Sequence, residues 1–449
     1  MKLSRRSVVA GAAALPFAAG ALAAVPVTVR VDAGKSLGRI STDFMGLGFE
    51  ISSVAVPGLL AASNHAYVDL VRELGRDGVI RIGGNTSDFS RYDPHGTAVS
   101  APKATVVTEA NLRELKTFVD AVGWKLIWGL NLGDDKLDNA VEEARAIAGI
   151  MSDRLLALEI GNEPDLFPRS GHRGADYGYP AYFADYRRYK AAIRAVLPHV
   201  PFAGPDLAGA PDWMEQFARD EPDAMLLTAH HYITGQANPA ATMETMLANN
   251  TKYDPVLARF QAAAQTAKKP WRMCETASFS GGGKEGVSDT YAAALWALDY
   301  LFVLAEQGCA GVNMETGVNH LGWISHYTPI SDDLKGHYGK APEYYGLQAF
   351  AHAGKGDLVQ ADCNAGGINC TAYATRDQDR VCVTFINKDT NQDAEVTISG
   401  VSAKPGEIMR LTGTALTAKD GVKLGRRESV NPQAVRVPAA SAALVWLDV

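Results

Sequence analysis

The chain has 449 residues, of which 47% are hydrophobic and 21% charged, so it can bury a large core and form two or three domains. Its formal net charge of −7 argues against nucleic acid as a partner, because proteins that bind nucleic acid present basic surfaces. After the N-terminus, no apolar run reaches the roughly 18 to 20 residues of a membrane span.

The N-terminus has the pattern of an export signal. Lys2, Arg5 and Arg6 form a basic head, an apolar stretch runs from Val8 to Leu22, and an Ala-Leu-Ala sequence provides the small residues of a cleavage site. The arginine pair resembles a twin-arginine signal. We therefore expect residues 1–23 to be a signal peptide and the protein to be exported, to the periplasm or the medium, by a bacterium. The alternative is an uncleaved membrane anchor.

The cysteines do not indicate a metal site. Two of them, Cys363 and Cys370, are close enough in sequence to close a short loop, although their spacing does not determine a pairing. The chain contains no Cys-x-x-Cys motif and no cluster of cysteine and histidine. We therefore predict no metal and no cofactor. The five cysteines are Cys274, Cys309, Cys363, Cys370 and Cys382.

Short apolar runs alternate with helical patterns between about residues 44 and 350. Helical spacing is clearest from Leu112 to Val122, after the expected cap Thr108, and from Tyr182 to Val196. Eight strands alternating with helices favour an α/β fold of the (β/α)8 TIM barrel type. A doubly wound open sheet is less favoured, because it usually carries a glycine-rich turn after its first strand. The expected strands are Phe44–Phe49, Val79–Ile82, Lys125–Asn131, Leu155–Ile160, Pro201–Gly204, Met225–Ala229, Trp271–Glu275 and Gly311–Glu315.

The pattern changes after about Gly354. Turn-forming residues separate runs of period two, such as Val381–Ile386 and Leu444–Leu447, which predict a small accessory β-sandwich. Residues 25–40 also alternate, and we expect them to pair with this C-terminal domain. The predicted domains are a signal peptide (1–23), N-terminal strands that join the β-domain (24–43), a catalytic barrel (44–352) and a β-sandwich (353–449).

Carboxylates stand at the ends of the fourth and seventh predicted strands. Glu163 precedes Pro164, which cannot continue a strand, and Glu275 closes the seventh strand. Reacting groups in a TIM barrel lie at the C-terminal strand ends, so both side chains should face one pocket. Retaining glycosidases need such a pair about 5–5.5 Å apart. We therefore predict a retaining glycosidase. The alternative is that both glutamates are structural rim carboxylates.

These motifs resemble a known family. The order and local sequence are similar to the clan A glycoside hydrolases and, within them, to glycoside hydrolase family 79, the β-glucuronidases and heparanases. The resemblance implies that Glu163 is the acid/base, Glu275 the nucleophile, Asn162 a ligand of the sugar 2-hydroxyl, and Tyr232 the residue that orients Glu275. The matching segments are Glu-Ile-Gly-Asn-Glu-Pro at 159–164, Ala-His-His-Tyr at 229–232, Cys-Glu-Thr-Ala-Ser at 274–278, three glycines at 281–283 and Ser-Asp-Thr at 288–290.

Several neighbours of the pair are further candidates. Glu50 and Asn85, at the ends of the first two strands, are candidate ligands of sugar hydroxyls. His230 shares the parity of Tyr232 and is preferred over His231 for the pocket. Arg81, at the end of the second strand, is assigned a supporting role.

Three more residues near the pair have other interpretations. Glu159 is expected to point into the barrel, Glu315 is equally a sugar ligand or a salt-bridge partner, and Cys274 is expected to be a buried structural residue.

The resemblance also implies how a uronate is recognised. In the family, tyrosine hydroxyls and backbone amides meet the sugar carboxylate. The glycine run, represented by Gly282, can supply amides, because glycine allows a close approach of the backbone. Tyr327 and Tyr338, after the eighth strand, are the expected tyrosines. Relatives carry a tyrosine five residues after the nucleophile, where this chain has Ser280, which puts a strict preference for unsubstituted glucuronate in doubt.

The predicted function is that of a cofactor-independent, retaining exo-β-glucuronidase acting on a glucuronide or on an oligosaccharide that contains uronic acid. One alternative is an endo-acting, heparanase-like enzyme that cleaves glycosaminoglycan chains. Another is a barrel that binds carbohydrate without catalysis, which the presence of both carboxylates disfavours. No partner beyond the substrate is predicted, neither nucleic acid nor membrane, and the sequence indicates no oligomeric state.

Overall fold

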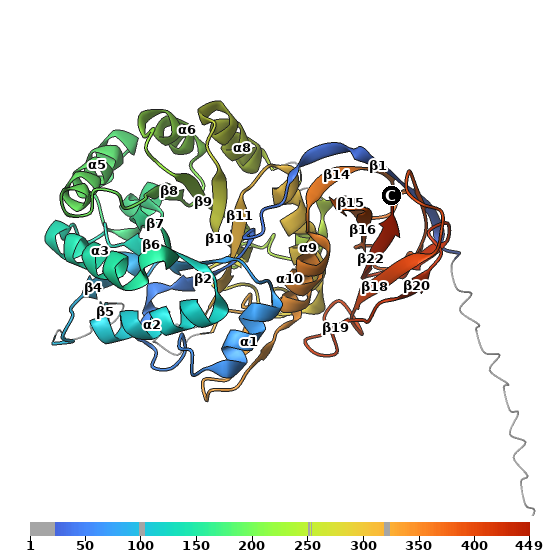
Figure 1. Cartoon of the computed structure of the whole chain (residues 1–449), viewed down its shortest axis with the longest axis horizontal. Coiled ribbons are helices and arrows are strands. Elements are labelled where there is room, and N and C mark those ends of the chain that lie inside the picture. Colours follow the sequence, from blue (N-terminus) through green and yellow to red (C-terminus); the bar gives the residue numbers. More distant parts are fainter. Residues whose placement is uncertain (1–22, 98–103, 250–251, 253, 318–323) are drawn as a thin grey trace, which may run out of the picture.

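A computed structural model describes residues 23–97, 104–249, 252, 254–317 and 324–449. The predicted signal peptide, apart from Ala23, therefore lies outside the described residues. Figure 1 shows two bodies side by side, a barrel with helices around it and a smaller body of strands. No helix in the described ranges combines the length and the apolar character that a membrane crossing requires.

The larger body contains eight parallel strands in the order β7-β6-β3-β2-β11-β10-β9-β8. A single parallel bridge between Leu158 and Phe202 joins the two ends of this sheet. The arrangement confirms the predicted TIM barrel. The barrel is nearly closed, and its strands follow one another around it in the order of the sequence. The strands are β2 (Met45–Glu50), β3 (Val79–Gly83), β6 (Lys125–Leu130), β7 (Leu155–Ile160), β8 (Ala203–Leu207), β9 (Leu226–Gly235), β10 (Trp271–Ser280) and β11 (Gly311–Thr316).

Helices cover the outside of the barrel (Figure 1). α2 begins where expected, because the Thr108 hydroxyl accepts the Asn111 N–H and the Asn111 side chain accepts the Thr108 N–H, a capping box. Two small sheets, β4 (Ser90–Tyr92) with β5 (Thr105–Val107) and β12 (Ile330–Asp332) with β13 (Tyr338–Lys340), lie in connecting loops. The helices are α1 (His65–Glu73), α2 (Glu109–Val122), α3 (Leu137–Met151), α4 (Phe167–Ser170), α5 (Tyr179–Val196), α6 (Pro211–Asp220), α7 (Met243–Leu247), α8 (Pro255–Ala267), α9 (Tyr291–Glu306) and α10 (Pro342–Ala353).

Three barrel strands end at least three residues later than predicted, while the C-terminal ends of the other five agree to within one residue. β8 ends at Leu207 rather than at residue 204, because the residues that follow Gly204 still pair with β9. β9 and β10 continue together as far as Gly235 and Ser280, so they form a ribbon that rises above the rest of the barrel. Glu275 therefore lies within its strand rather than at the end of it.

The smaller body is a mainly antiparallel sheet that includes the N-terminal strand. β1 pairs antiparallel with β14 and parallel with β17, which confirms the expected participation of the N-terminus in the accessory β-sandwich. The domain limits at residues 44 and 353 remain a proposal. The strands are β1 (Val25–Arg39), β14 (Asp357–Asn364), β15 (Cys370–Asp377), β16 (Arg380–Asn387), β17 (Ala394–Ser399), β18 (Gly406–Thr412), β19 (Lys423–Leu424), β20 (Glu428–Val430), β21 (Val435–Val437) and β22 (Ser441–Asp448).

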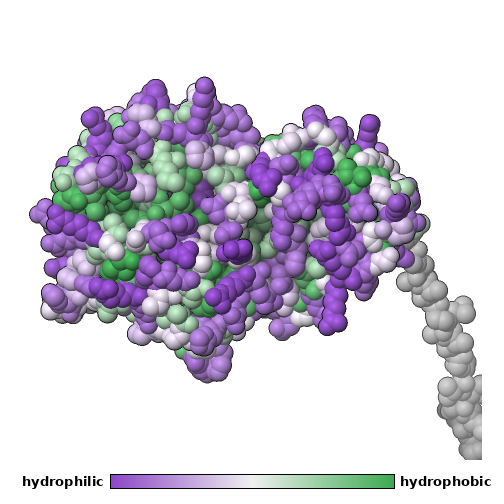
Figure 2. All heavy atoms as spheres, in the orientation of Figure 1, coloured by the Kyte–Doolittle hydropathy of each residue, from purple (hydrophilic) through white to green (hydrophobic). Residues whose placement is uncertain are grey.

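Helix α9 joins the two bodies. It is apolar all round, which is typical of a helix without a solvent-facing side, and nearly all of it is buried. Its single buried carboxylate, Asp299, accepts hydrogen bonds from Thr371 and Tyr373 of β15 and from the Lys388 ammonium. These bonds satisfy a charge that would otherwise be buried without a partner. Figure 2 shows that hydrophilic residues cover most of one face of the molecule, with hydrophobic ones mainly over the barrel.

Candidate active site

Glu163 leaves the fourth barrel strand in an unusual backbone conformation. Its φ of 49° lies in the left-handed region, two residues after Gly161 at 82°. The Glu163 N–H donates to the carbonyl of Asp206 in the neighbouring strand (2.9 Å), which holds this turn in place. Pro164 then begins a 3-10 turn. The chain therefore turns away from the barrel at this point, and the Glu163 carboxylate remains at the rim.

Glu275 enters the same space because β10 contains a bulge. The pairing with β9 passes directly from Met273 to Glu275, so Cys274 is the extra residue and the alternation of side chains shifts. The Tyr232 hydroxyl donates to one oxygen of Glu275 (2.8 Å), and Arg81 Nη1 donates to the other (2.9 Å). A carboxylate oxygen of Glu275, one of Glu163 and a His230 ring nitrogen all lie within 4.8 Å of one another.

Arg81 is the centre of the polar network below the pair. Besides Glu275, it donates through Nε to Glu159 (3.3 Å) and through Nη2 to Asp206 (2.6 Å) and to the Asn162 side-chain oxygen (2.8 Å). The guanidinium is completely buried. Its planar set of donors can hold several carboxylates in fixed directions, which a single ammonium group cannot do. Arg81 therefore orients residues from several barrel strands at once.

Replacement of this arginine should be costly. Arg81→Met is expected to destabilise the protein by about 3–5 kcal/mol, because it leaves buried carboxylates without their cation. Urea denaturation would measure the effect. The control is Arg113→Met, which removes an exposed pair with Glu109 on α2 and should cost about 1 kcal/mol or less. If the two variants unfolded at the same urea concentration, the network would not be a stabilising element.

His230 connects Glu163 to the interior. Its Nδ1 faces a Glu163 oxygen at 3.0 Å, and its Nε2 faces an Asp206 oxygen at 2.8 Å. Burial lowers the pKa of His230, but the Asp206 and Glu275 carboxylates outweigh it and raise that pKa well above its usual value. Burial also raises the pKa of Glu163, and the nearby Glu275 adds to this, while His230 opposes it. A proton can therefore be shared between Glu163 and His230.

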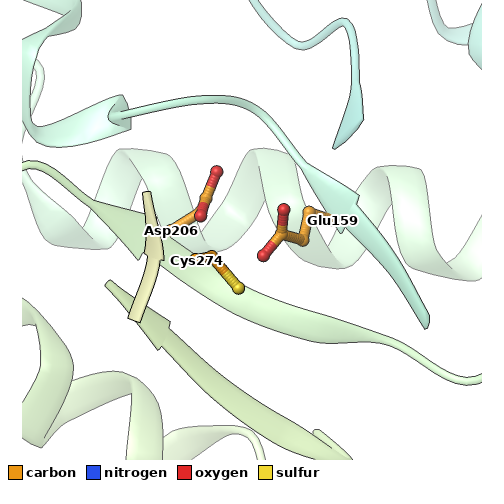
Figure 3. A group of neighbouring side chains, drawn as sticks. All are labelled: Glu159, Asp206 and Cys274. Atoms are coloured by element: carbon orange, nitrogen blue, oxygen red, sulfur yellow. The ribbon is translucent and has the colours of Figure 1, made fainter. Parts of the chain in front are cut away.

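A second acidic cluster lies beneath the site. Figure 3 shows Glu159 of β7, Asp206 of β8 and Cys274 of β10 pointing toward one another. Burial and the Asp206 charge raise the pKa of Glu159 to about 7, and burial keeps the Cys274 pKa well above its usual value. Cys274 is thus a buried thiol. Because the Arg81 guanidinium already pairs with both carboxylates, we assign no metal here.

The first two strands contribute Glu50 and Asn85. The two carboxylate oxygens of Glu50 accept hydrogen bonds from the backbone that follows β3. One accepts the Asn85 N–H (3.2 Å) and the other the Thr86 N–H (2.7 Å). Burial and the Glu275 charge raise its pKa to about 7. Asn85 lines a cavity of about 270 Å³ together with Asn162 and Glu163. The structure thus places Asn85 beside the pair, whereas Glu50 supports the loop that carries it.

The two candidate tyrosines occupy different places. Tyr327 is buried and forms a hydrogen bond with Tyr232. Burial is the main cause that raises the pKa of Tyr327, and the nearby Glu315 and Glu275 charges raise it further. Tyr338 instead packs edge-on against Tyr67 of α1, with ring centroids 5.2 Å apart. The site therefore contains Tyr327 and not Tyr338, which the sequence did not distinguish.

The glycine run follows β10 next to Tyr327. All three glycines have positive φ, and a side chain on Gly283 would come within 2.9 Å of the Tyr327 backbone nitrogen. The Gly283 N–H donates to Phe279, and the Gly282 carbonyl accepts the His326 N–H. The loop of Tyr327 is thus tied to this run. Gly282 keeps its own N–H without a partner among the described residues.

His231 and Glu315 occupy different positions relative to the pocket. His231 points away from the pocket, facing the Tyr300 hydroxyl (2.9 Å) and Asp254 (3.2 Å), so His230 is the histidine at the site. Glu315 is buried near Glu50 and Glu275, and burial and these charges raise its pKa well above its usual value. One of its oxygens has no hydrogen-bond partner within the described part of the chain.

Sequence reasoning missed two carboxylates that position the site. Asp206, in β8 with a φ of 61°, bonds both Arg81 and His230. Asp88 accepts the Asn162 N–H (2.9 Å) with one oxygen and the N–H groups of Leu132 and Gly133 with the other. The signal for Asp206 was an acidic residue at the end of the fifth strand, which the predicted end at residue 204 excluded.

No protein-family model matches the chain. The chain is similar to a β-glucuronidase of Aspergillus niger, 26% identical over 391 residues, which are 76% of this chain and 70% of the relative. It is also similar to a β-glucuronidase of Neurospora crassa (26% identity, 61% of this chain and 55% of the relative) and to the heparanase of Gallus gallus (24%, 61% and 63%). The chain thus spans little more than half the length of the Neurospora relative.

Solved structures share the fold. A 4-O-α-L-rhamnosyl-β-D-glucuronidase from Fusarium oxysporum superposes with a TM-score of 0.75 at 21% identity, covering 94% of this chain and 100% of that one. A family 51 α-L-arabinofuranosidase from Bifidobacterium longum gives a TM-score of 0.73 at 15% identity, covering 94% and 99%. At these identities the likeness shows that the barrel and β-domain occur together in the same arrangement.

The relatives correct one prediction and confirm another. The expected exported bacterial protein is contradicted, because the curated relatives come from two fungi and a bird and point to a eukaryotic origin. A basic pair before an apolar run is too short a pattern to identify the source of a chain. The motifs at the two glutamates were the better guide: the chain resembles glycoside hydrolase family 79, the family of β-glucuronidases and heparanases.

Proposed function

We propose that the protein is a retaining exo-β-glucuronidase, with Glu163 as acid/base and Glu275 as nucleophile. The observation that carries the proposal is the approach of the two carboxylates, with oxygens within 4.8 Å of each other at the rim of a barrel. This spacing suits a retaining enzyme, in which the carboxyl groups are about 5–5.5 Å apart. An inverting enzyme needs about 6.5–9.5 Å, to leave room for a water molecule.

The surroundings of each glutamate suit its role. Glu275 accepts hydrogen bonds from Tyr232 and Arg81, which hold its carboxylate in a fixed direction for attack on the anomeric carbon. Glu163 donates its proton to the leaving oxygen, and the sugar becomes bonded to Glu275. In the second step Glu163 takes a proton from water, which attacks the anomeric carbon and releases Glu275. Each step inverts the anomeric carbon, because Glu275 and then water attack opposite faces of the sugar, so the β configuration returns after two inversions.

His230 assists the exchange of this proton. When Glu163 is protonated, its hydroxyl can donate to His230 Nδ1, while Nε2–H of the ring donates to Asp206. In the second step, the ring can share the proton that Glu163 takes from water, because Asp206 and Glu275 stabilise the imidazolium. His230 is thus a positioning residue for the acid/base. Both of its ring nitrogens face carboxylates, so neither is left for a sugar hydroxyl.

The leaving group has room on both sides of Glu163. A cavity of about 460 Å³ is lined by Glu163, Trp213 and Ser280, and the smaller one by Glu163 and Asn85. The larger cavity is also lined by Tyr232, which bonds Glu275, and the smaller one by Asn162. This space also favours a second candidate, a heparanase-like endo enzyme. The products formed from a long uronic-acid-containing chain distinguish the two candidates. An exo enzyme releases single glucuronate residues from the chain ends, whereas an endo enzyme cuts inside the chain and rapidly lowers its average length.

Recognition of the uronate is assigned to Tyr327, which lies near Glu275, and to the Gly282 amide in the glycine run beside Tyr327. Because a site matched to a buried polar group rejects substrates that lack it, nitrophenyl β-glucuronide should be preferred over the β-glucoside by roughly 10³-fold or more in kcat/KM. Tyr327→Phe should reduce that preference and leave glucoside turnover nearly unchanged. Tyr338→Phe is the matched control and should leave the preference intact. Equal hydrolysis of both sugars by the parent protein would exclude the uronate assignment while leaving the two-glutamate mechanism standing.

A further inference from the structure

Two cysteines face each other across a hairpin far from the glutamate pair. β14 and β15 pair antiparallel with Asp357 opposite Arg376 and Val359 opposite Ala374. The same register, continued toward the turn, places Cys363 opposite Cys370. The backbone ladder between β14 and β15 ends at Val359, and β14 pairs with β1 along its whole length, but a side-chain hydrogen bond still joins the two thiols.

The backbone suits a covalent bond between them. Facing residues of antiparallel strands have Cβ atoms about 4.5–5.5 Å apart, close to the range of about 3.5–4.5 Å found in disulfides. The turn between them contains Gly366 and Gly367, both with positive φ, which reverse the chain without strain. Bond formation therefore requires only a small approach of two side chains that already touch.

The two thiols also differ in reactivity, as an attacking and a resolving cysteine do. Cys363 is half-buried, whereas Cys370 is buried in the core of the β-domain. The hydrogen bond from the Cys370 thiol lowers the pKa of Cys363, and the Lys252 ammonium lowers it further. The same contact raises the pKa of Cys370. A thiolate at Cys363 is therefore the favoured nucleophile.

The remaining cysteines lack these features. Cys274, Cys309 and Cys382 are all buried, and burial raises the pKa of each thiol. None of them has a second cysteine among its contacts. The hairpin is therefore the place in this chain where thiol chemistry with a small oxidant is favoured.

We propose that Cys363 and Cys370 form a redox-active pair that closes to a disulfide by exchange with a low-molecular-weight disulfide. The Cys363 thiolate attacks one sulfur of the reagent, forms a mixed disulfide and releases one thiolate. Cys370 then loses its proton, attacks the Cys363 sulfur and releases the second thiolate. The two cysteines are oxidised by two electrons, and the reagent is reduced to two thiols.

Closure would act at the contact between the two bodies of the protein. Next to Cys370, Asn369 donates to the Leu247 carbonyl at the end of α7 (3.0 Å), and Asn249 donates to the Cys370 carbonyl (3.4 Å). The hairpin tip is therefore docked on the barrel. A disulfide would restrict the hairpin to the docked shape, because it removes open conformations from the chain.

The test uses the full chain and glutathione disulfide. After incubation, the protein is denatured in acid, alkylated and digested with trypsin, which cuts after Lys355 and Arg376 and leaves both cysteines in the peptide 356–376. We expect this peptide without alkylation and lighter by two hydrogen atoms. The number of alkylated cysteines should fall from five to three and return to five after reduction with dithiothreitol.

Variants locate the bond. Cys363→Ser should prevent closure, and Cys370→Ser should leave a stable glutathione adduct on Cys363. Cys382→Ser, a change in a neighbouring strand, should still form the bond. If peptide 356–376 of the parent protein carried two alkylated cysteines after oxidation, or if Cys363→Ser still lost two thiols, the proposal would be wrong.

Discussion

Glu275→Gln is expected to lower kcat for aryl β-glucuronides by roughly 10⁴-fold or more, because an amide cannot form the covalent glycosyl-enzyme. The amide keeps the shape of the side chain and can still accept a hydrogen bond from Arg81 or Tyr232. The loss should therefore appear in kcat while the substrate still binds. Steady-state rates with a nitrophenyl glucuronide measure it.

The matched control is another buried glutamate of the barrel. Glu143 of α3 accepts a hydrogen bond from the Trp128 indole (3.0 Å) and belongs to no part of the glutamate site. Burial raises its pKa to about 8, so the carboxyl is largely uncharged at neutral pH and Glu143→Gln is a mild change. This variant should retain activity within a few-fold. Glu275→Gln activity close to that of the control would mean that Glu275 is not the nucleophile.

Glu163→Gln is expected to slow substrates with poor leaving groups by roughly 10²–10⁴-fold, because they need a proton as the bond breaks. Dinitrophenyl glucuronides, whose leaving group needs no proton, should form the intermediate at a nearly normal rate. Azide should then restore part of the turnover by replacing the water that Glu163 no longer activates, and the product should be the β-glucuronyl azide. Azide rescue of Glu275→Gln instead would reverse the two roles.

The pH dependence follows from the same residue. Burial and the Glu275 charge raise the pKa of Glu163 above the usual 4.5, so the acid remains protonated at a pH where an exposed glutamate would be ionised. For a poor leaving group, kcat/KM should fall as the pH rises through this raised pKa. Glu163→Gln should remove that fall. A fall that persisted in the variant would assign the limb to another group.

Much of the fold could be predicted, because each barrel strand except the fifth is an apolar run bounded by turn residues. The fifth strand reads Ala-Gly-Pro-Asp-Leu, with little β propensity, and its residues are strand only because β9 pairs with them. The bulge at Cys274 likewise depends on the pairing of β10 with β9 and has no mark in the sequence. The side chains on the two sides of Cys274 therefore do not follow the simple alternation of a regular strand.

The candidate site was predictable where a motif carries it. Both glutamates were placed on the rim, and the structure brings their oxygens within 4.8 Å. The convergence of Asp206 and Glu159 on Arg81 could not be predicted, because it depends on which side chains of distant strands face inward at the same height. The difference between Tyr327 and Tyr338 depends on the path of one loop, which composition does not determine.

The stereochemistry of the first product tests the central claim most directly. Hydrolysis of a nitrophenyl β-glucuronide is followed by proton nuclear magnetic resonance from the first minutes, before the anomers of free glucuronic acid equilibrate. Two displacements through Glu275 predict that the β anomer appears first and that the α anomer grows in later. If the α anomer appeared first, the enzyme would invert, and the assignment of Glu275 as a nucleophile within reach of Glu163 would be contradicted.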